Sequence, residues 1–556
     1  MERGDESMKK EGAILNSSRF YRALSTPAAL LLTLLFLAPL AIILSKAFIA
    51  EEGGVTLNRL KGLFSDPYTY RILGFTLMQA LLSTLVSLLL ALPGAYLLAN
   101  YKFRGRGVVK ALTTIPFILP SILVVLGFVI FYGSSGLINT LLGKMGVGPI
   151  RILYTFGAII MAHAFYNFPI ALGLIATYWE NLSPLYTQVS ATLGAKRGKS
   201  FRTITLPRLM PAILSASTLI FLFCFTSFVI LLVLGGGPRF TTLEVEIYRR
   251  AKMSLDLGGA AALSLLSIAV ALLFVALHLA FQRRMSHQEE APKMVYKKAP
   301  APLMKLFIFL YSLLALIFVL GPLLSIIYRS FRAPFTRSGE LVFSLRWYRE
   351  LFNNPLIIRS LITSLAIAAI VTVGSLLVAT PLAARLRYRG KALELYAMLP
   401  MAVSSVIIGF GYYLISTLFK RGPSLSFLLV VLAHIVIASP FVLRTLLPEY
   451  RKIAFSYTEV SLTLGATVGQ TFRKVELPLL RGAIATAGAF AFAISIGEFN
   501  ATLILGDINT TTVPIVMYRL INSYNFAGAC ALGTILMLLC FFIFFIVETL
   551  KRRSNG

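Results

Sequence analysis

The chain contains two sets of apolar runs that are each long enough to cross a lipid bilayer, which takes roughly 20 residues in a helix. The first set lies near residues 27–48, 72–100, 111–132, 152–178, 212–234 and 259–282, and the second lies near 304–328, 357–384, 393–418, 426–448, 482–505 and 527–549. Because lipid offers no partners to backbone polar groups, such runs must be helical. The sequence therefore predicts an all-α, polytopic membrane protein with about twelve transmembrane helices.

The composition excludes a water-soluble enzyme, since 57% of the 556 residues are hydrophobic and only 13% are charged. The 52 Lys and Arg exceed the 22 Asp and Glu and punctuate the gaps between the apolar runs, which indicates a bilayer rather than nucleic acid as the partner. The larger share of these basic residues falls in segments that face the cytoplasm if the N-terminus does. We therefore expect a multi-pass protein of the inner membrane with both termini in the cytoplasm.

The chain repeats itself. Thr187–Ile213 aligns without a gap with Thr458–Ile484, and more than half of the aligned residues are identical. We therefore predict two parallel six-helix repeats at 1–290 and 304–556, joined by a cytoplasmic linker at 291–303. His163 and His434 are equivalent in this alignment, so we expect them to pack or hydrogen-bond within their own repeats. Cys224, Cys530 and Cys540 lie in apolar runs without metal-ligand spacing, and we expect no metal site.

The most similar segment of the two repeats is a cytoplasmic loop between the fourth and fifth spans, at 187–213 and 458–484. Loops usually vary more than the elements that they join, so this similarity indicates a surface that docks the same partner twice. The alternative is a loop that only packs between spans. We expect a short helix, a turn at the glycine, and a second helix that ends at Leu-Pro before the next span.

This loop resembles the EAA loop of binding-protein-dependent ABC importer permeases, in which E-A-A is followed by glycine and then by I-x-L-P. The second copy has Glu459-Val460-Ser461, Gly465 and Val475-Glu476-Leu477-Pro478, and the first has Gln188-Val189-Ser190, Gly194 and Ile204-Thr205-Leu206-Pro207. The spacing agrees in both copies, while Gln188 and the two Val-Ser pairs depart from the motif. The resemblance implies the type I ABC importer permease fold.

The resemblance also implies partners. Each loop would dock one copy of an ABC ATPase, and an external solute-binding protein would deliver solute to the outer loops near 49–70, 235–257 and 506–526. This chain would be no enzyme and would bind no cofactor itself, because ATP and Mg would sit on the ATPase. The implied docking residues are Gln188, Gly194, Ala195, Leu206 and Pro207 in the first loop, and Glu459, Gly465, Ala466, Leu477 and Pro478 in the second.

Two other interpretations of the sequence fit less well. Gly194–Ser200 superficially resembles a phosphate-binding loop, but the glycine spacing is one residue short and the second copy has Gln470-Thr471 in place of Lys199-Ser200. A secondary transporter also has twelve spans in two parallel halves, but its spans would carry several carboxylates for proton coupling. Neither interpretation accounts for the paired loops.

Polar residues within the spans are the candidates for the solute pathway, because ionisable groups are costly in lipid. We expect Glu498, Asn500, Ser227, Tyr166 and Asn167 to contribute. Glu498 either attracts a cationic solute or hydrogen-bonds neighbouring helices, and both possibilities stay open. Stretches such as Ala162–Pro169 and Gly235–Pro238 resemble the fused thiamine permeases, so the implied solute is thiamine or its phosphates, with ferric iron as the alternative.

Overall fold

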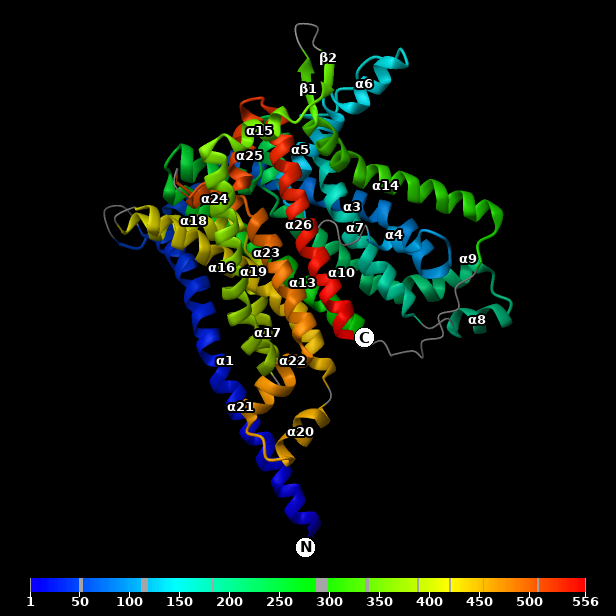
Figure 1. Cartoon of the computed structure of the whole chain (residues 1–556), viewed down its shortest axis with the longest axis vertical. Helices are drawn as coiled ribbons and strands as arrows, with labels where there is room; N and C mark the ends of the chain where they lie inside the picture. The colour runs from blue at the N-terminus through cyan, green and yellow to red at the C-terminus, as the bar shows by residue number, and fades with distance from the viewer. Residues whose placement is uncertain are drawn as a thin grey trace. The chain divides into compact units, whose positions relative to one another are not determined.

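The computed structural model describes residues 2–49, 54–111, 119–182, 185–286, 299–335, 340–387, 390–419, 422–453, 455–507 and 510–555 (Figure 1). Most of the predicted linker 291–303 lies outside these ranges. Within them the backbone is almost entirely helical, with a single two-stranded hairpin, so the predicted all-α class is confirmed.

The helices before the linker are α1 (Glu2–Phe48), α2 (Asn58–Ser65), α3 (Pro67–Asn100), α4 (Arg106–Ala111), α5 (Ser121–Tyr132), α6 (Leu137–Lys144), α7 (Phe156–Glu180), α8 (Leu185–Thr192), α9 (Arg197–Ser200), η2 (Phe201–Thr205), α10 (Leu206–Phe225), α11 (Val229–Leu234), η3 (Pro238–Phe240), α12 (Leu243–Tyr248), η4 (Arg249–Met253) and α13 (Leu257–Ser286).

The helices after the linker are α14 (Pro302–Ser330), α15 (Arg346–Phe352), α16 (Pro355–Leu386), α17 (Lys391–Met398), η6 (Leu399–Ala402), α18 (Ser405–Thr417), α19 (Pro423–Lys452), α20 (Phe455–Thr463), α21 (Val468–Thr471), η7 (Phe472–Glu476), α22 (Leu477–Leu479), α23 (Arg481–Gly497), α24 (Asn500–Leu505), α25 (Val513–Asn522) and α26 (Phe526–Asn555). Strands β1 (Arg332–Phe335) and β2 (Glu340–Phe343) pair antiparallel, with Arg332 opposite Phe343.

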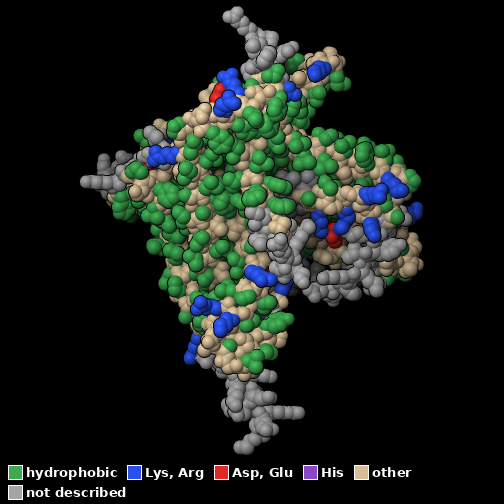
Figure 2. Space-filling model, in the orientation of Figure 1, with side chains coloured by type: hydrophobic (Ala, Val, Ile, Leu, Met, Phe, Trp, Pro, Cys, Tyr) green, Lys and Arg blue, Asp and Glu red, His purple; other side chains and the backbone are tan. Residues whose placement is uncertain are grey.

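Ten helices of the described residues are long and apolar enough to cross a membrane, and two bent helix pairs raise the number to as many as twelve. The predicted number of spans therefore agrees with the structure. Figure 2 shows hydrophobic side chains covering most of the visible helical surface, while Lys and Arg gather near the ends of the helices. A surface of this kind suits contact with lipid tails rather than with water.

The chain forms two compact units: unit 1 holds most of the second sequence repeat together with α1, and unit 2 holds most of the first repeat together with α14. Unit 1 comprises Met1–Ile49, Glu350–Arg519 and Ile535–Gly556, and unit 2 comprises Ala50–Arg349 and Leu520–Thr534. Within unit 1, α1 packs against α16 and α18, and within unit 2, α14 packs against α5. The compact units therefore differ from the predicted repeats 1–290 and 304–556, which describe similarity along the sequence.

A glycine and a proline let these exchanged helices approach closely. A Cβ atom on Gly411 of α18 would lie 2.6 Å from Cβ of Pro39 in α1, and one on Gly127 of α5 would lie 3.0 Å from the Pro322 carbonyl oxygen in α14. Pro39 has no N–H to bond the Leu35 carbonyl, and the Tyr412 hydroxyl donates to that carbonyl at 2.8 Å instead. Each unit thus uses the same small-residue contact.

Within the described residues, three predicted spans are interrupted rather than continuous. In the predicted span 212–234, α10 ends at Phe225 and α11 starts at Val229. In 482–505, α23 ends at Gly497 and α24 starts at Asn500, and in 393–418 the helices on either side of residues 402–405 meet at 87°. In the last two breaks a side chain caps the second helix. Glu498 accepts a hydrogen bond from the Ala501 N–H at the start of α24, and Ser404 accepts one from the Ile407 N–H at the start of α18. Hydropathy alone does not reveal such caps.

The expected end of the loop's second helix at Leu-Pro is wrong in the first copy. There one continuous helix runs from Gly198 to Phe225, and in the second copy the helix bends by 71° only after Leu479. In both copies a π-helical turn, η2 or η7, precedes the proline, so the N–H of Leu206 bonds the carbonyl of Phe201 and that of Leu477 bonds Phe472. The wider π turn gives the proline ring room inside a continuing helix.

Candidate functional site

The predicted glycine turn is present in both loops with the same hydrogen bonds. Gly194 and Gly465 have φ values of 78° and 86°, a conformation that glycine adopts without a steric penalty. The N–H of Ala195 bonds the Ser190 carbonyl at 3.0 Å, and the N–H of Ala466 bonds the Ser461 carbonyl at 3.1 Å. The N–H of Gly194 also bonds the Ala191 carbonyl, and that of Gly465 bonds the Leu462 carbonyl. Together these bonds form a Schellman motif that ends α8 and α20.

A pair of hydroxyl groups closes each loop. Ser190 Oγ lies 2.7 Å from Ser200 Oγ, and Ser461 Oγ lies 2.9 Å from Thr471 Oγ1 in the equivalent place. Each pair joins the helix before the glycine to the helix after it. The serine that replaces the second alanine of the EAA motif therefore hydrogen-bonds the two helices of its loop together. The sequence indicates this hydrogen bond by a Ser or Thr ten positions after that serine in both copies.

A buried ion pair anchors only the second loop. Arg387, at the end of α16, lies 3.0 Å from Glu476 Oε1, and both side chains are 1% exposed. The hydroxyls of Thr458 and Tyr450 also donate to this carboxylate, at 3.3 and 3.4 Å. The equivalent of Glu476 in the first loop is Thr205, so the first loop lacks the carboxylate. The two loops thus share a backbone but differ in how they attach to the spans.

Aromatic contacts complete the attachment of each loop. Within unit 1, the Phe472 ring packs against Phe20 and Tyr21 of α1, with ring centroids 6.4 and 6.1 Å apart. Within unit 2, Phe201, the equivalent of Phe472, stacks on Trp179 of α7 at 6.1 Å. Figure 1 shows α1 running past α21 within unit 1. The same phenylalanine therefore packs on a different helix in each unit.

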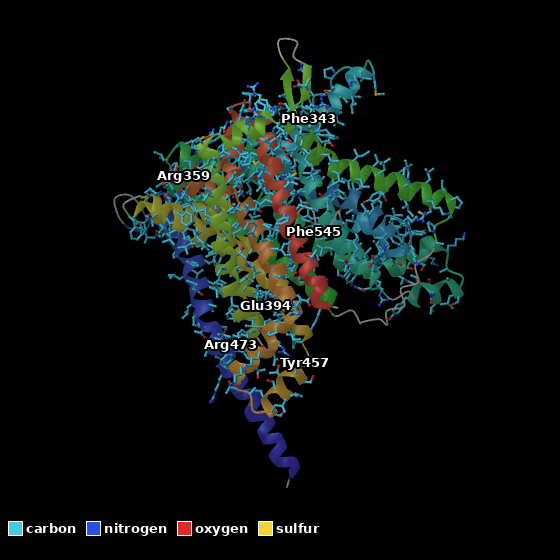
Figure 3. All side chains as sticks on the ribbon, viewed as in Figure 1. Phe343, Arg359, Glu394, Tyr457, Arg473 and Phe545 are labelled. Atoms are coloured by element: carbon cyan, nitrogen blue, oxygen red, sulfur yellow. The ribbon has the colours of Figure 1, made fainter. Side chains whose placement is uncertain are left out.

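A second ion pair occurs in both repeats with its charges reversed. Arg106 of α4 lies 2.6 Å from Glu180 at the end of α7, and Glu394 of α17 lies 2.7 Å from Arg451 at the end of α19. Glu180 and Arg451 are equivalent in the aligned repeats. Each pair ties the segment after the second span of its repeat to the helix that enters the loop, and Figure 3 labels Glu394 in this position.

The loops expose a matched row of large apolar side chains. In the first loop, Tyr186 and Val189 on α8 and Leu193 directly after it are 45%, 48% and 81% exposed. In the second, Tyr457 and Val460 on α20 and Leu464 directly after it are 57%, 56% and 82% exposed. The three positions lie at i, i+3 and i+7, so they share one face of the helix. An apolar helix face of this spacing fits a hydrophobic groove on a partner protein. Sequence reasoning missed these residues, although their duplication was visible.

The predicted docking residues divide into exposed and half-buried groups. The exposed ones are Gln188, Gly194, Pro207, Glu459, Gly465 and Pro478. The half-buried ones are Ala195, Leu206, Ala466 and Leu477. Each loop therefore presents its polar first position and its glycine at the surface together with the apolar row, while the Leu of Leu-Pro packs inward.

The predicted pathway residues lie in two separate groups. In unit 1, Glu498 Oε1 accepts the Ala501 N–H at 2.9 Å, and the Asn500 amide donates to Ser405 Oγ at 2.7 Å. In unit 2, Asn167 donates to the His163 carbonyl and to Cys224 Sγ. Tyr166 donates to the Leu119 carbonyl at 3.5 Å, and Ser227 lies between α10 and α11. Both groups border the interrupted helices.

The two equivalent histidines differ in their partners. His434 Nδ1 lies 3.0 Å from Ser495 Oγ and its Nε2 lies 2.9 Å from Thr502 Oγ1, so both ring nitrogens are hydrogen-bonded across the break between α23 and α24. His163 Nδ1 lies 3.1 Å from Ser83 Oγ, while its Nε2 has no partner among the described residues. The expected hydrogen bonding within each repeat is confirmed, and the described residues hold no cluster of potential metal ligands.

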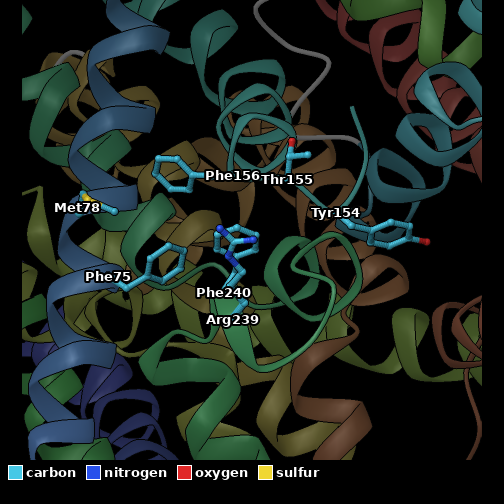
Figure 4. Close-up of a pocket in the computed structure, with 7 residues that line it drawn as sticks. All are labelled: Phe75, Met78, Tyr154, Thr155, Phe156, Arg239 and Phe240. Carbon is cyan, nitrogen blue, oxygen red and sulfur yellow. The ribbon is translucent and has the colours of Figure 1, made fainter. Parts of the chain in front are cut away.

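A cavity of about 460 Å³ opens in unit 2 near the start of α7 (Figure 4). Its lining consists of Phe75, Met78, Tyr154, Thr155, Phe156, Arg239 and Phe240. The loop with the apolar row follows the other end of α7, so the 25 residues of this helix separate the cavity from the loop. Sequence reasoning named the segment 235–257 as an outer loop but not this cavity.

Comparisons with known proteins agree with these features. Residues 84–287 and 370–556 match the family described as "Binding-protein-dependent transport system inner membrane component". The "Thiamine transport system permease protein ThiP" of Brucella suis is 29% identical over 94% of this chain and 95% of the relative. The protein of that name from Escherichia coli K12 is 29% identical over 91% of this chain and 94% of its own length.

A more distant relative matches part of the chain. The "Sulfate transport system permease protein CysT" of Salmonella typhimurium is 25% identical over 44% of this chain and 87% of its own length. The family match falls in two halves, which correspond to the two sequence repeats and include both loops.

Proposed function

Since the chain belongs to the family of binding-protein-dependent transport system inner membrane components, we propose that it forms the membrane pathway of an importer for thiamine or its phosphates. The similarity to thiamine permeases over 94% of the chain carries the proposal. The family match at residues 84–287 and 370–556 includes both loops and the interrupted spans 212–234, 393–418 and 482–505. The proposed protein moves its solute without chemical change, so it is a transporter subunit rather than an enzyme.

We propose further that a separate ATPase subunit docks under each loop and supplies the energy. The matched apolar rows on α8 and α20 support this, because a soluble partner is needed to cover exposed Leu193 and Leu464. Two similar surfaces suit two copies of one partner. ATP and Mg would be bound by that partner, whose closure would pull the loops together and rock the two repeats about the solute site.

The proposed orientation places the loops and both termini in the cytoplasm. An external solute-binding protein would then deliver the solute to the opposite side, at segments 49–70, 235–257 and 506–526, part of which lies outside the described residues. The excess of Lys and Arg in the segments on the loop side supports this orientation.

Uptake of labelled thiamine into cells that carry or lack this chain tests the proposal, with ferric iron as a parallel tracer. We expect thiamine uptake to fall to background without the chain while iron uptake is unchanged. Loss of iron uptake alone would replace the solute but leave the transporter assignment. Unchanged uptake of both would contradict the proposed solute and the ferric-iron alternative.

A further inference from the structure

The cavity at the start of α7 has the shape and lining of a ligand site. It is formed by three separate segments, namely α3, residues 154–156 at the start of α7, and η3, and all of them belong to unit 2. Its volume of about 460 Å³ falls within the range of small-molecule sites, which is roughly 300–1,000 Å³. Its place at the end of α7 opposite the docking loop is where a delivered solute would arrive.

Three phenylalanine rings form one wall of this cavity. The ring centroid of Phe75 lies 5.8 Å from that of Phe156 and 5.7 Å from that of Phe240, and Phe156 and Phe240 stack at 6.2 Å with an interplanar angle of 28°. Such a wall favours a flat aromatic ligand, because aromatic rings gain both buried area and favourable ring–ring contacts.

Arg239 brings a positive charge to the same wall. Figure 4 shows its side chain lying over the Phe240 ring, and its guanidinium carbon is 5.3 Å from that ring's centroid. The side chain is exposed, and no carboxylate pairs with it among the described residues. Thr155 caps α7 through the Ala158 N–H at 3.2 Å, so the positive end of the α7 dipole also borders the cavity.

The cavity wall contains strained backbone. Tyr154 has a φ of 60°, which is unusual for a residue with a bulky side chain, and its aromatic ring points away from the three phenylalanines in Figure 4. A Cβ on the adjacent Gly236 would lie 3.0 Å from Cβ of Tyr154, so glycine is needed for this close contact. Strain of this kind is concentrated at binding and catalytic sites.

We propose that this cavity binds a flat heteroaromatic ring that carries a phosphate ester, with the ring against the phenylalanine wall and the phosphate on Arg239. The inference rests on the proposed function and refines its solute. Within the thiamine series it favours thiamine monophosphate over thiamine, because arginine binds phosphate by charge-assisted hydrogen bonds and repels a cation that lacks one.

The second repeat does not build this site. Asn509 and Thr510 precede Thr511-Thr512 where Arg239 and Phe240 precede Thr241-Thr242, so the second repeat has neither the arginine nor the aromatic residue. A transporter that moves one solute at a time needs one such site rather than two.

Binding of radiolabelled thiamine monophosphate and thiamine to the purified full-length chain in lipid nanodiscs tests the proposal. For the wild type we expect the ester to bind about tenfold more tightly than thiamine. Arg239→Gln should weaken ester binding about tenfold while thiamine binding changes less than about twofold. Arg239→Lys should keep most of the preference, and Phe240→Leu should weaken both ligands. Arg151→Gln, which removes an exposed arginine outside the lining, is the matched control.

Three results would overturn the inference: equal wild-type affinity for the two ligands, an Arg239→Gln variant that behaves like Arg151→Gln, or displacement of the ester by inorganic phosphate at equal concentration. Each is distinguishable from failure of the proposed function, because thiamine uptake by cells that carry the wild-type chain is measured separately. A size-exclusion profile equal to that of the wild type verifies that each variant is folded.

Discussion

Arg387 and Glu476 form a fully buried ion pair between the end of α16 and the second loop, 458–484, with 3.0 Å between the charged atoms. The hydroxyls of Tyr450 and Thr458 donate hydrogen bonds to the Glu476 carboxylate. The Arg387 guanidinium also donates to the Ile453 carbonyl at 2.7 Å. Burying two charges is costly unless each is hydrogen-bonded in this way. The pair therefore holds the loop to one span in a single geometry.

Arg387→Met should destabilise the protein strongly, because it leaves the Glu476 carboxylate buried without its cation. Breaking a buried pair in this way costs about 3–5 kcal/mol, whereas replacing both partners by apolar residues is often close to neutral. We therefore expect the double variant Arg387→Met/Glu476→Leu to recover most of the stability. The measurement is the temperature at which the purified protein loses its monodisperse size-exclusion peak. A single variant as stable as the wild type would show that the pair contributes little.

Leu193→Asp and Leu464→Asp should each weaken ATPase docking at one loop without unfolding the protein, because both side chains are more than 80% exposed. Loss of a central apolar anchor from an interface typically costs about 2–4 kcal/mol. We expect each single variant to retain about half of the co-purified ATPase and the double variant to retain almost none. Lys196→Gln, on the same loop but outside the apolar row, serves as the control. Full recovery of ATPase with the double variant would place docking elsewhere.

Substitution of Gly465 should weaken the loop only moderately. The residue has a φ of 86°, yet a Cβ there would meet no atom within 4 Å, so the cost is backbone strain and not a clash. That strain amounts to about 1–2 kcal/mol for a residue with a Cβ. We expect Gly465→Asn to lower ATPase co-purification little and Gly465→Val to lower it more, because asparagine tolerates this conformation. Equal and complete loss with both would indicate that the ATPase itself contacts this glycine.

The sequence predicted the helices, the repeats and the loop turns because these depend on hydropathy and on local glycine geometry. Gly194 and Gly465 lie in the predicted turns, since a positive φ at the end of a helix is a local requirement. The Arg387–Glu476 pair escaped prediction because its partners are far apart in the chain and only one repeat has the carboxylate. The exchange of α1 and α14 between units also depends on long-range contacts, such as that of Gly411 with Pro39.

The cavity and the interrupted spans illustrate the same limit. Hydropathy places residues 482–505 in one apolar run, and only the side-chain cap from Glu498 to the Ala501 N–H explains why the helix restarts there. Phe75 and Phe156 lie in two different predicted spans and Phe240 lies in a predicted outer loop, so no spacing rule could bring them together. Sequence reasoning predicted residues whose role depends on nearby positions in the chain, and it missed residues whose contacts are with distant positions.

Substitutions of Glu498 distinguish the two roles that the sequence left open for this residue, attraction of a cationic solute and hydrogen bonding to neighbouring helices. Its carboxylate caps α24, and glutamine keeps a carbonyl oxygen that can accept the same N–H. If the residue acts by capping the helix, Glu498→Gln should transport thiamine at close to the wild-type rate. Glu498→Ala should then lose about 0.5–2 kcal/mol of stability with the cap. If the charge attracts a cationic solute, Glu498→Gln should instead raise the KM for uptake several-fold at an unchanged maximal rate. We expect the first result, because the structure gives the carboxylate a hydrogen bond within its own helix break, and KM together with thermal stability for both variants decides between them.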